Sequence, residues 1–184
     1  MSALLNVERA TLVRGGHLLF EGLDLALAPG EAVHVTGPNG CGKSSLIRLV
    51  AGLLSPSAGR IERAEAALAD EGLALDRELP LRRALAWWGG PRLNDAIEQY
   101  DLGRLGDVPV RLLSNGQAKR ARLARVMASG APLWLLDEPL NGLDRDGTGR
   151  LAGAIDRHRA AGGAVLAASH VALGGVWRTI ELGQ

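Results

Sequence analysis

The N-terminal part of the chain alternates apolar and polar positions, which predicts β-strands. Residues 4–12 and 18–27 fit two strands joined by a turn at residues 13–16. A tight turn then leads to residues 31–36, where valines alternate with polar side chains. We therefore expect residues 4–36 to form a small antiparallel sheet.

The middle of the chain predicts one buried helix and then gives weaker signals. Residues 45–52 carry apolar side chains at helical spacing and end at a glycine, as buried helices often do. A turn and a short strand are expected over residues 54–61, whereas residues 62–75 give no clear signal. One or two helices are expected over residues 79–100, with a break at the sequence Gly89-Gly90-Pro91.

The C-terminal part alternates strands with a helix. The apolar runs Leu133–Leu136 and Ala164–Ala168 have the length and composition of buried parallel strands. A helix is expected between them over residues 146–161, and residues 176–182 alternate as an edge hairpin would. This order is typical of an α/β domain with a parallel sheet.

A further helix is expected before the strand Leu133–Leu136, after a turn-rich connector over residues 101–111. Ser114 is a good N-cap residue for it, and small or apolar side chains line one of its faces. The other face is basic, and we expect at least two of its members to be solvated: Lys119, Arg120, Arg122 and Arg125.

Length, composition and charge limit the class of protein. The 184 residues suit one domain, 1–184, and an uncharged run over residues 161–177 is too short and too polar to cross a bilayer. The first eight residues lack the basic segment of a secretory signal. The single cysteine excludes an internal disulfide and suits a reducing compartment. A net charge of +1 gives no electrostatic case for nucleic acid as the main ligand.

The stretch Gly37–Ser44 fits the phosphate-binding pattern G-x-x-x-x-G-K-[ST] between a predicted strand and a predicted helix. Its glycines allow a sharp turn that aims N–H groups inward, and the helix adds the positive end of its dipole. Lys43 is suited to reach the β- and γ-phosphates, and the Ser44 hydroxyl is suited to ligate Mg²⁺. The alternative is a glycine-rich turn that carries a lysine by chance. The candidate nucleotide-binding residues are Gly37, Pro38, Asn39, Gly40, Cys41, Gly42, Lys43, Ser44 and Ser45.

Two acids, Asp137 and Glu138, directly follow a predicted buried strand. The carboxyl ends of strands are where α/β sheets bind ligands. Asp137 is therefore a candidate Mg²⁺ ligand, directly or through water, and Glu138 a candidate general base for the attacking water. The alternative is that both acids occupy the first turn of a helix, where acids are favoured.

Taken in order, five motifs resemble the nucleotide-binding domain of the ATP-binding cassette (ABC) family: residues 37–44, 113–117, 133–138 and 141–144, and His170. The most specific is the signature segment, Leu113-Ser114-Asn115-Gly116-Gln117. The resemblance covers nearly the whole chain. It implies an α/β P-loop NTPase fold with a mostly parallel core sheet, a small N-terminal antiparallel β subdomain and a short helical subdomain over about residues 70–128.

The family resemblance also implies a mechanism that uses ATP and Mg²⁺ in a head-to-tail homodimer. Ser114, Asn115, Gly116 and Gln117 would then face the ATP of the second subunit, since a helix N-terminus with a serine and a glycine suits an anion. Asp144 resembles the D-loop acid that communicates between the two sites. His170 resembles the switch histidine that contacts the γ-phosphate, although a histidine after a strand is often only a strand-end residue.

Three features depart from the family pattern. Asn115 stands where glycine is usual, and the Q-loop glutamine is absent, with Asp70 or Glu71 near its place. No aromatic residue stands where the family stacks adenine, but Arg14 is nearby, and a guanidinium can stack on a ring. These departures put the usual coupling between nucleotide and transporter in question.

A narrower resemblance, to the haem exporter ATP-binding subunits of bacterial cytochrome c maturation, rests on residues 14–23, 37–59, 137–144 and 161–165. It implies a peripheral subunit on the cytoplasmic face of the inner membrane, bound to integral membrane transporter subunits. The four histidines are scattered along the sequence and no Cys–His pair occurs, so haem would be handled only indirectly, through partners.

The membrane-partner surface is expected at residues 70–100, with Trp87 and Trp88 as exposed anchors, because aromatic residues are enriched at interfaces. The alternative is that one or both tryptophans belong to the core.

Two other functions stay open. One is a soluble ABC ATPase that acts on nucleic acid or in translation, although such proteins carry paired cassettes or long coiled-coil insertions. The other is a cassette that binds ATP and regulates a partner with little turnover, which the absent glutamine favours and Glu138 and His170 oppose.

Overall fold

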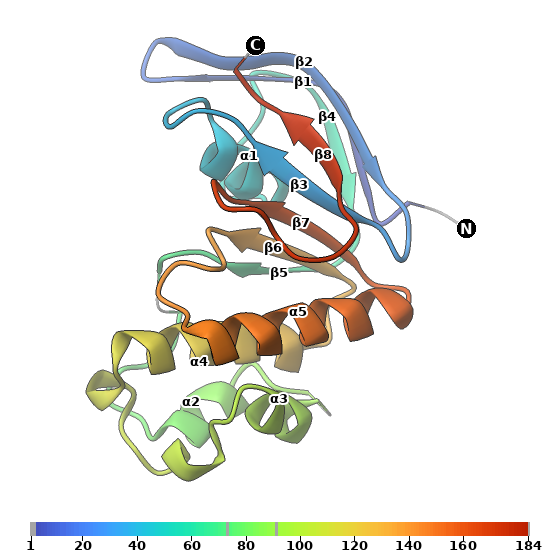
Figure 1. The fold of residues 1–184 in the computed structure, drawn as a ribbon. Coiled ribbons are helices and arrows are strands. Elements are labelled where there is room, and N and C mark those ends of the chain that lie inside the picture. Colours follow the sequence, from blue (N-terminus) through green and yellow to red (C-terminus); the bar gives the residue numbers. More distant parts are fainter. Residues whose placement is uncertain (1–2, 73, 91, 184) are drawn as a thin grey trace.

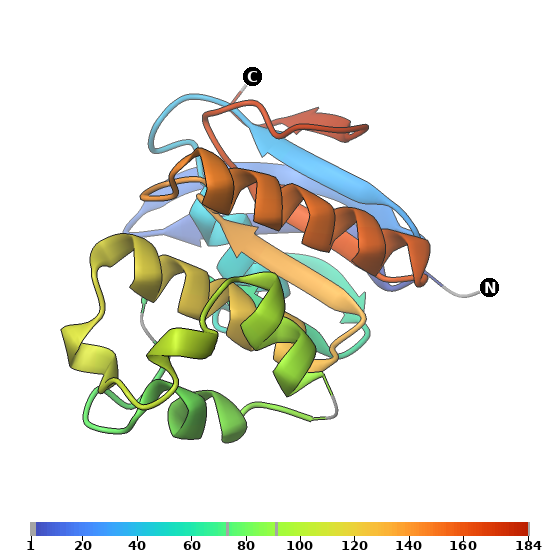
Figure 2. The ribbon, with the colours of Figure 1, turned by 60° about the horizontal axis from the view of Figure 1, so that its bottom comes forward.

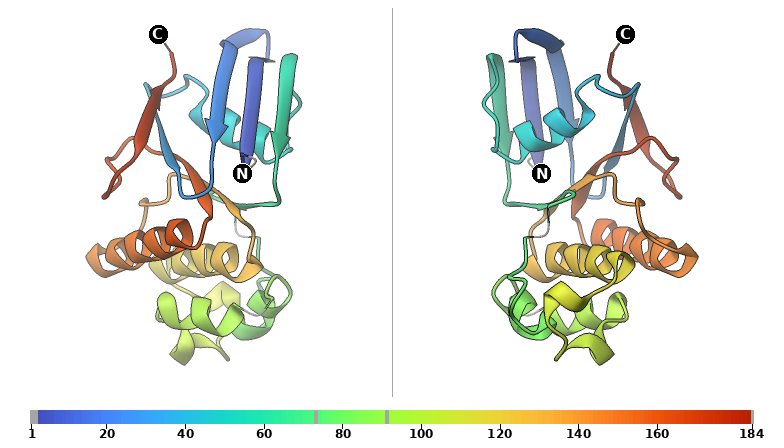
Figure 3. Two further views of the ribbon diagram at one scale, coloured as in Figure 1. Left: turned by 90° about the vertical axis from the view of Figure 1, so that its right-hand side faces the viewer. Right: turned by 90° about the vertical axis from the view of Figure 1, so that its left-hand side faces the viewer.

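Two β-sheets and a group of helices form the layers of the protein (Figure 1). The structure is a computed structural model that describes residues 3–72, 74–90 and 92–183. A three-stranded antiparallel sheet lies on one side of helix α1 (Lys43–Val50), and a five-stranded parallel sheet lies on the other (Figure 3). The predicted α/β fold, with a parallel core and an N-terminal antiparallel sheet, is confirmed.

The antiparallel sheet has the strand order β2-β1-β4. Its strands are β1 (Leu5–Arg14), β2 (His17–Leu27) and β4 (Ala58–Arg63), so the predicted hairpin and the short strand are confirmed. The prediction that residues 31–36 join this sheet is wrong, because β3 (Ala32–Thr36) pairs in parallel with β7. Four of the five residues of β3 are buried, which suits a strand that is covered on both faces.

The parallel sheet has the strand order β5-β6-β7-β3-β8. Besides β3 it contains β5 (Ala66–Ala69), β6 (Leu133–Asp137), β7 (Ala164–Ala168) and β8 (Arg178–Glu181). The sequence analysis missed β5, because its three alanines and one leucine lack the β-branched and aromatic side chains that mark strands. The predicted C-terminal hairpin is wrong, since β8 is a single edge strand that pairs in parallel with β3.

The parallel sheet separates two hydrophobic cores. Leu133 and Leu135 of β6 pack with α1 and the antiparallel sheet, whereas Trp134 and Leu136 pack with the helices on the other face. This division follows from the strand geometry, in which successive side chains point to opposite faces. The helices that cover the second face are α4 (Asn115–Ser129) and α5 (Arg145–Ala160), close to the predicted bounds.

Two short helices, α2 (Leu81–Ala86) and α3 (Leu93–Gln99), lie beyond α4 and complete the helical layer (Figure 2). The predicted break between them is confirmed for Gly89 and Gly90, whereas Pro91 lies outside the described residues. Two 3-10 turns, Gly103–Leu105 and Val110–Leu112, occupy the predicted connector. No helix in the described ranges is both long enough and apolar enough to cross a membrane.

The basic face of α4 is not solvated, so that expectation is wrong. Lys119 and Arg125 are buried, Arg120 and Arg122 are half-buried, and each donates a hydrogen bond to a backbone carbonyl. The acceptors are the carbonyl oxygens of Glu138 for Lys119, Tyr100 for Arg120, Asp70 and Glu71 for Arg122, and Leu68 for Arg125. Three of these four side chains therefore satisfy carbonyls at the ends of β5 and β6, which need donors wherever the sheet stops.

A stacked pair of rings joins α5 to the start of β6. The rings of Trp134 and His158 lie 4.0 Å apart between centroids and 11° from parallel. His158 Nε2 lies 3.1 Å from the Pro132 carbonyl oxygen, and a Cβ on Gly163 would lie 2.2 Å from the same nitrogen. Burial lowers the pKa of His158 to about 4, while its hydrogen bonds to the backbone of Pro132 and Ala164 act the other way.

Acid is therefore expected to destabilise the fold through His158. Because the pKa falls from 6.5 to about 4 on folding, the unfolded chain binds more protons than the folded chain between these values. The stability contributed by His158 is fully present above about pH 6.5 and is lost as the pH falls through about 4, up to ~3 kcal/mol. The check is urea unfolding from pH 7 to pH 4.

The matched variants are His158→Phe, which keeps an aromatic ring, and His17→Phe at the exposed first residue of β2. The free energy of unfolding should depend less on pH in His158→Phe, whereas His17→Phe should behave as the wild type. A His158→Phe protein with an unchanged pH dependence would contradict the assignment.

Candidate functional site

The carboxyl ends of β3, β6 and β7 meet at one edge of the parallel sheet, and the predicted motifs follow these three strands. The glycine-rich loop joins β3 to α1, Asp137 ends β6, and His170 comes two residues after β7. The order of strands thus brings together residues that lie more than one hundred positions apart in the sequence.

The glycine-rich loop needs glycine at two tight positions. Gly37 has a φ of 136°, and a Cβ there would lie 2.3 Å from the Leu182 carbonyl oxygen. Gly42 caps α1 in the left-handed conformation, with a φ of 106°. Leu182 also donates its backbone N–H to the Thr36 carbonyl oxygen, 2.9 Å away. The chain after β8 therefore packs against the loop, a contact that the sequence analysis did not anticipate.

Lys43 is folded over the loop that precedes it. Its Nζ donates to the carbonyl oxygens of Gly37 and Pro38 at 2.8 and 2.9 Å, and the residue is buried. The ammonium group therefore lies at the rim of the loop, held by neutral acceptors. A phosphate oxygen is a stronger acceptor for this group, because a charge-assisted hydrogen bond exceeds a neutral one.

Ser44 and Asp137 are joined by a hydrogen bond of 2.9 Å from Ser44 Oγ to Asp137 Oδ1. Burial raises the pKa of the Asp137 carboxyl above its ordinary value, and the neighbouring carboxylates of Glu138 and Asp70 raise it further. The Ser44 hydrogen bond and Arg48 act in the opposite direction. Burial therefore disfavours the charged form of this carboxyl, and a divalent cation bound to Ser44 Oγ and the Asp137 carboxylate would favour the charged form instead.

Glu138 and His170 also meet, with His170 Nδ1 2.9 Å from Glu138 Oε2. The backbone of Glu138 is strained, since its φ is 45°, and a non-glycine residue in such a region costs about 1–3 kcal/mol. Its N–H donates to the Ala168 carbonyl oxygen at 2.8 Å, and its own carbonyl accepts from Lys119 Nζ at 2.8 Å. The strained backbone is thus held from both sides, which aims the carboxylate toward His170.

Lys119 is the residue of this edge that the sequence analysis missed, because it was grouped with a basic face expected to be partly solvated. Burial lowers its pKa to about 8 and Arg122 lowers it further, while the acids Asp137, Glu71 and Glu138 act the other way. The only sequence signal available was its place on the helix that carries the signature segment.

A cleft of about 450 Å³ opens beside the loop. Arg14, His17 and Leu19 of the β1–β2 hairpin line it together with loop residues and Glu138. Arg14 therefore lies where the sequence analysis looked for a residue to stack on adenine, and His17 is a neighbour that it did not anticipate. The residues that line the cleft on its loop side are Asn39, Gly40, Gly42, Lys43, Ser44 and Ser45.

The signature segment lies at the start of α4 and does not line this cleft. Ser114 is the N-cap of α4, and it exchanges hydrogen bonds with Gln117 in a capping box. Ser114 and Asn115 are exposed, and a Cβ on Gly116 would lie 3.4 Å from the Gly142 carbonyl oxygen. The start of α4 thus presents a serine and an asparagine outward, beside the loop that leads to Asp144.

Asp144 caps α5, its Oδ1 accepting the Gly147 backbone N–H at 2.7 Å. Asp70 follows β5 directly, and the register that pairs Ala69 with Leu136 sets Asp70 level with Asp137 on the neighbouring strand. Asp70 therefore occupies the strand end where the sequence analysis looked for a substitute for the glutamine.

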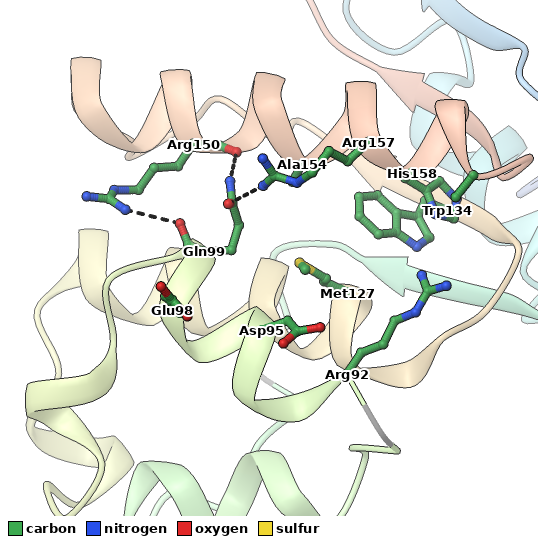
Figure 4. Close-up of a pocket in the computed structure, with 11 residues that line it drawn as sticks. Arg92, Asp95, Glu98, Gln99, Met127, Trp134, Arg150, Ala154, Arg157 and His158 are labelled. Carbon is green, nitrogen blue, oxygen red and sulfur yellow. Dashed lines mark hydrogen bonds between the residues drawn. The ribbon is translucent and has the colours of Figure 1, made fainter.

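A second cleft, of about 680 Å³, lies between α3 and α5, away from the loop (Figure 4). Gln99 crosses it: its Nε2 donates to the Arg150 carbonyl oxygen at 2.6 Å, and its Oε1 accepts from Arg157. Arg150 returns a hydrogen bond of 3.2 Å to the Gln99 carbonyl oxygen. These contacts join α3 to α5, so the side chain of Gln99 has a structural role away from the glycine-rich loop.

The exposed tryptophans lie on a third groove, of about 570 Å³, which Leu75, Leu79 and Ala84 also line. Trp87 is 85% exposed and Trp88 is 42% exposed, so neither belongs to the core. The Arg125 guanidinium lies 4.8 Å from the centroid of the Trp88 ring.

Comparisons with known proteins found a family model, curated relatives and solved structures that this chain resembles. The family model for the ABC transporter matches residues 20–141. The cytochrome c biogenesis ATP-binding export protein CcmA of Sphingopyxis alaskensis is 56% identical over 180 residues, which cover 94% of this chain and 93% of that protein. The protein of the same name from Novosphingobium aromaticivorans is 58% identical over 159 residues, covering 85% and 83%.

A solved structure of an ATP-binding subunit of an ABC transporter superposes with a TM-score of 0.84 at 24% identity, covering 91% of this chain and 80% of that one. A putative ABC transporter ATP-binding protein from Pyrococcus furiosus gives the same TM-score at 20% identity, covering 97% and 96%. At these identities the two structures support the fold alone.

Alkylation of Cys41 is expected to block ATP binding. The thiol is half-buried, and a Cβ built on Gly37 would lie 2.9 Å from its Sγ, so an added group has to displace the loop. Because Cys41 is the only cysteine, one equivalent of N-ethylmaleimide labels one site, and MgATP should slow the labelling.

The checks are mass spectrometry for the label and titration with a fluorescent ATP analogue. Cys41→Ser treated with the same reagent is the control and should keep its affinity. Fully alkylated wild-type protein that binds ATP as before would refute the prediction.

Proposed function

The chain belongs to the ABC transporter family, and on that premise we propose that it is the ATP-hydrolysing subunit of a transport complex that serves cytochrome c biogenesis. The observation that carries the proposal is the paired geometry at one sheet edge, with Ser44 bonded to Asp137 and Glu138 bonded to His170. The export and cytochrome c assignments come from the names of the relatives.

We propose that the loop residues 37–45 bind the phosphates of ATP and that Lys43 exchanges its two carbonyl partners for phosphate oxygens. Ser44 and Asp137 would hold Mg²⁺, which fits the burial of the Asp137 carboxyl and its raised pKa. When bound, the ion would neutralise charge on the phosphates. Arg14, at the rim of the cleft, would stack on the adenine ring.

For the chemical step, Glu138 would accept the proton of the attacking water, with its carboxylate aimed by His170 Nδ1. His170, which follows β7, would also contact the γ-phosphate. A carboxylate positioned as a general base typically raises the reaction rate about 10²–10⁴-fold, and we expect an effect of this size from Glu138.

We propose a second copy of the chain as the partner that completes the site. The N-terminus of α4 has an exposed Ser114, half-buried Gly116 and a positive dipole end, and these features suit the γ-phosphate of the second subunit. Asn115 and Gln117 belong to the same segment, and Asp144 would lie at the contact between the two copies.

Integral membrane subunits would dock on the helical subdomain, which we take as about residues 70–128. The groove beside Trp87 and Trp88 is apolar and is bordered by the charged residues Asp76 and Arg83, as docking surfaces often are. The chain would then sit peripherally at the cytoplasmic face of the inner membrane.

Haem, as the cargo, would be handled by these partners. In the part of the chain that the structure describes, no group of three or more His, Cys, Asp or Glu side chains is arranged to hold a metal ion.

Glu138→Gln is expected to lower kcat at least 100-fold while ATP affinity stays within about threefold, because the amide keeps the shape but cannot accept a proton. ATPase assays and ATP titrations, alone and in membranes that contain the partner subunits, provide the check. Glu98→Gln, an exposed acid on α3, is the matched control and should keep wild-type turnover. Tight ATP binding without turnover in the wild type would instead identify a regulatory cassette.

Trp87→Ala and Trp88→Ala are expected to weaken membrane association about tenfold or more, because buried aromatic anchors dominate interface energies. ATP affinity should stay within about twofold. Flotation with membranes that contain the partner subunits measures the first quantity, and Leu53→Ala, 62% exposed on another surface, is the control. Equal losses of membrane association and ATP binding would indicate misfolding and would argue against the docking groove.

A further inference from the structure

Lys119 joins the signature helix to the acid that we assign as the general base. Its Nζ donates to the Glu138 carbonyl oxygen at 2.8 Å, and the side chain is only 3% exposed. The lysine lies five positions after the N-cap Ser114, about 7–8 Å along the axis of α4. A single side chain thus connects the helix that carries the signature segment with the strained residue after β6.

We propose that Lys119 is a positioning residue for ATP hydrolysis, which fixes the backbone of Glu138 so that its carboxylate is aligned for the attacking water. This inference rests on the proposed function and names a residue outside the motifs assigned above. Lys119 does not touch the nucleotide cleft, since the residues that line that cleft come from the hairpin, the loop and Glu138. It acts on the reaction through Glu138.

The need for such a contact comes from the backbone of Glu138. A φ of 45° is unfavourable for glutamate, and residues in this region keep it only when their surroundings hold them. The N–H of Glu138 is fixed by the Ala168 carbonyl, and its side chain by His170. Lys119 makes the shorter of two hydrogen bonds to the remaining group, the carbonyl, at 2.8 Å. Small displacements of a catalytic group cost up to about 100-fold in rate.

Stability alone does not account for a lysine at this position. The side chain is buried, and burial depresses its pKa to about 8, so its charged form is unfavourable in the fold. The Glu138 carbonyl has a second donor, the Asn141 N–H at 3.3 Å, and would not be left unpaired without the lysine. An apolar side chain of similar length should therefore be tolerated, since it removes a group whose charged form is disfavoured by burial and leaves the carbonyl with a donor.

The contact between Lys119 and Glu138 would also carry a movement of α4 to the general base. Because Lys119 and Ser114 belong to one helix, a shift of α4 caused by a phosphate at its N-terminus would move the carbonyl partner of Glu138. Each subunit would then align its own base when its signature helix receives the nucleotide of the second copy.

The test compares Lys119→Met, Lys119→Arg and Arg120→Met in steady-state ATPase assays with the partner subunits present. Lys119→Met removes the donor and keeps the length, and we expect kcat to fall about 10–100-fold with KM for ATP within about threefold. Lys119→Arg restores a donor and should recover most of kcat. Arg120→Met, which loses the neighbouring bond to the Tyr100 carbonyl on the other side of α4, should keep wild-type kcat.

Thermal unfolding of the same proteins separates positioning from structure. Lys119→Met should melt at or above the wild-type temperature while its kcat is low. A wild-type kcat in Lys119→Met would overturn the proposal. So would an equal fall in the kcat of Arg120→Met, or a fall in the ATP affinity of Lys119→Met as large as its fall in kcat. Glu138→Gln in the same assay keeps the two ideas apart, because its normal turnover would refute the proposed function instead.

Discussion

The hydrogen bond between Ser44 and Asp137 is the contact on which the rest of the site depends. It joins the first turn of α1 to the end of β6, two elements separated by 93 positions in the sequence. Both groups in this bond are oxygen ligands of the kind that Mg²⁺ prefers, which is why we propose this position for the ion beside the phosphates. The order β6-β7-β3 then brings His170 within reach of Glu138 and leaves the glycine-rich loop beside them.

Several acidic side chains lie close together at the same edge of the parallel sheet. Asp70, Glu71, Asp137 and Glu138 follow two neighbouring strands, and the basic side chains of α4 face them. These side chains donate mainly to carbonyl oxygens and do not form close ion pairs with the acids. The acids therefore have no close cationic partner among the described residues of α4, and Asp137 has a raised pKa. A buried acid with a shifted pKa at the end of a strand is typical of sites built for catalysis or ion binding.

Helix α4 contributes to three of the parts for which a function is proposed: the signature segment, the Glu138 backbone and the tryptophan groove. Its N-cap carries the signature serine, Lys119 reaches Glu138, and Arg125 contacts both the Leu68 carbonyl and the ring of Trp88. A 15-residue helix is about 22 Å long, which is enough to span the distance between these contacts. The strand ends that carry Glu138, the start of α4 and the tryptophan groove are thus linked by contacts of one helix, even though no glutamine stands at the end of β5.

Local sequence patterns were enough to predict the glycine-rich loop, the acids at the end of β6, the capped signature helix and the strands β6 and β7. They did not determine that β3 leaves the antiparallel sheet, that the alanine-rich β5 is a strand, or that β8 stands alone, since strand pairing is a long-range choice made by packing. The basic residues of α4 show most clearly what a local sequence pattern fails to predict. Whether a lysine is solvated or donates to the carbonyl of a strained residue depends on which strand ends lie beside it, and strand order is set by long-range packing.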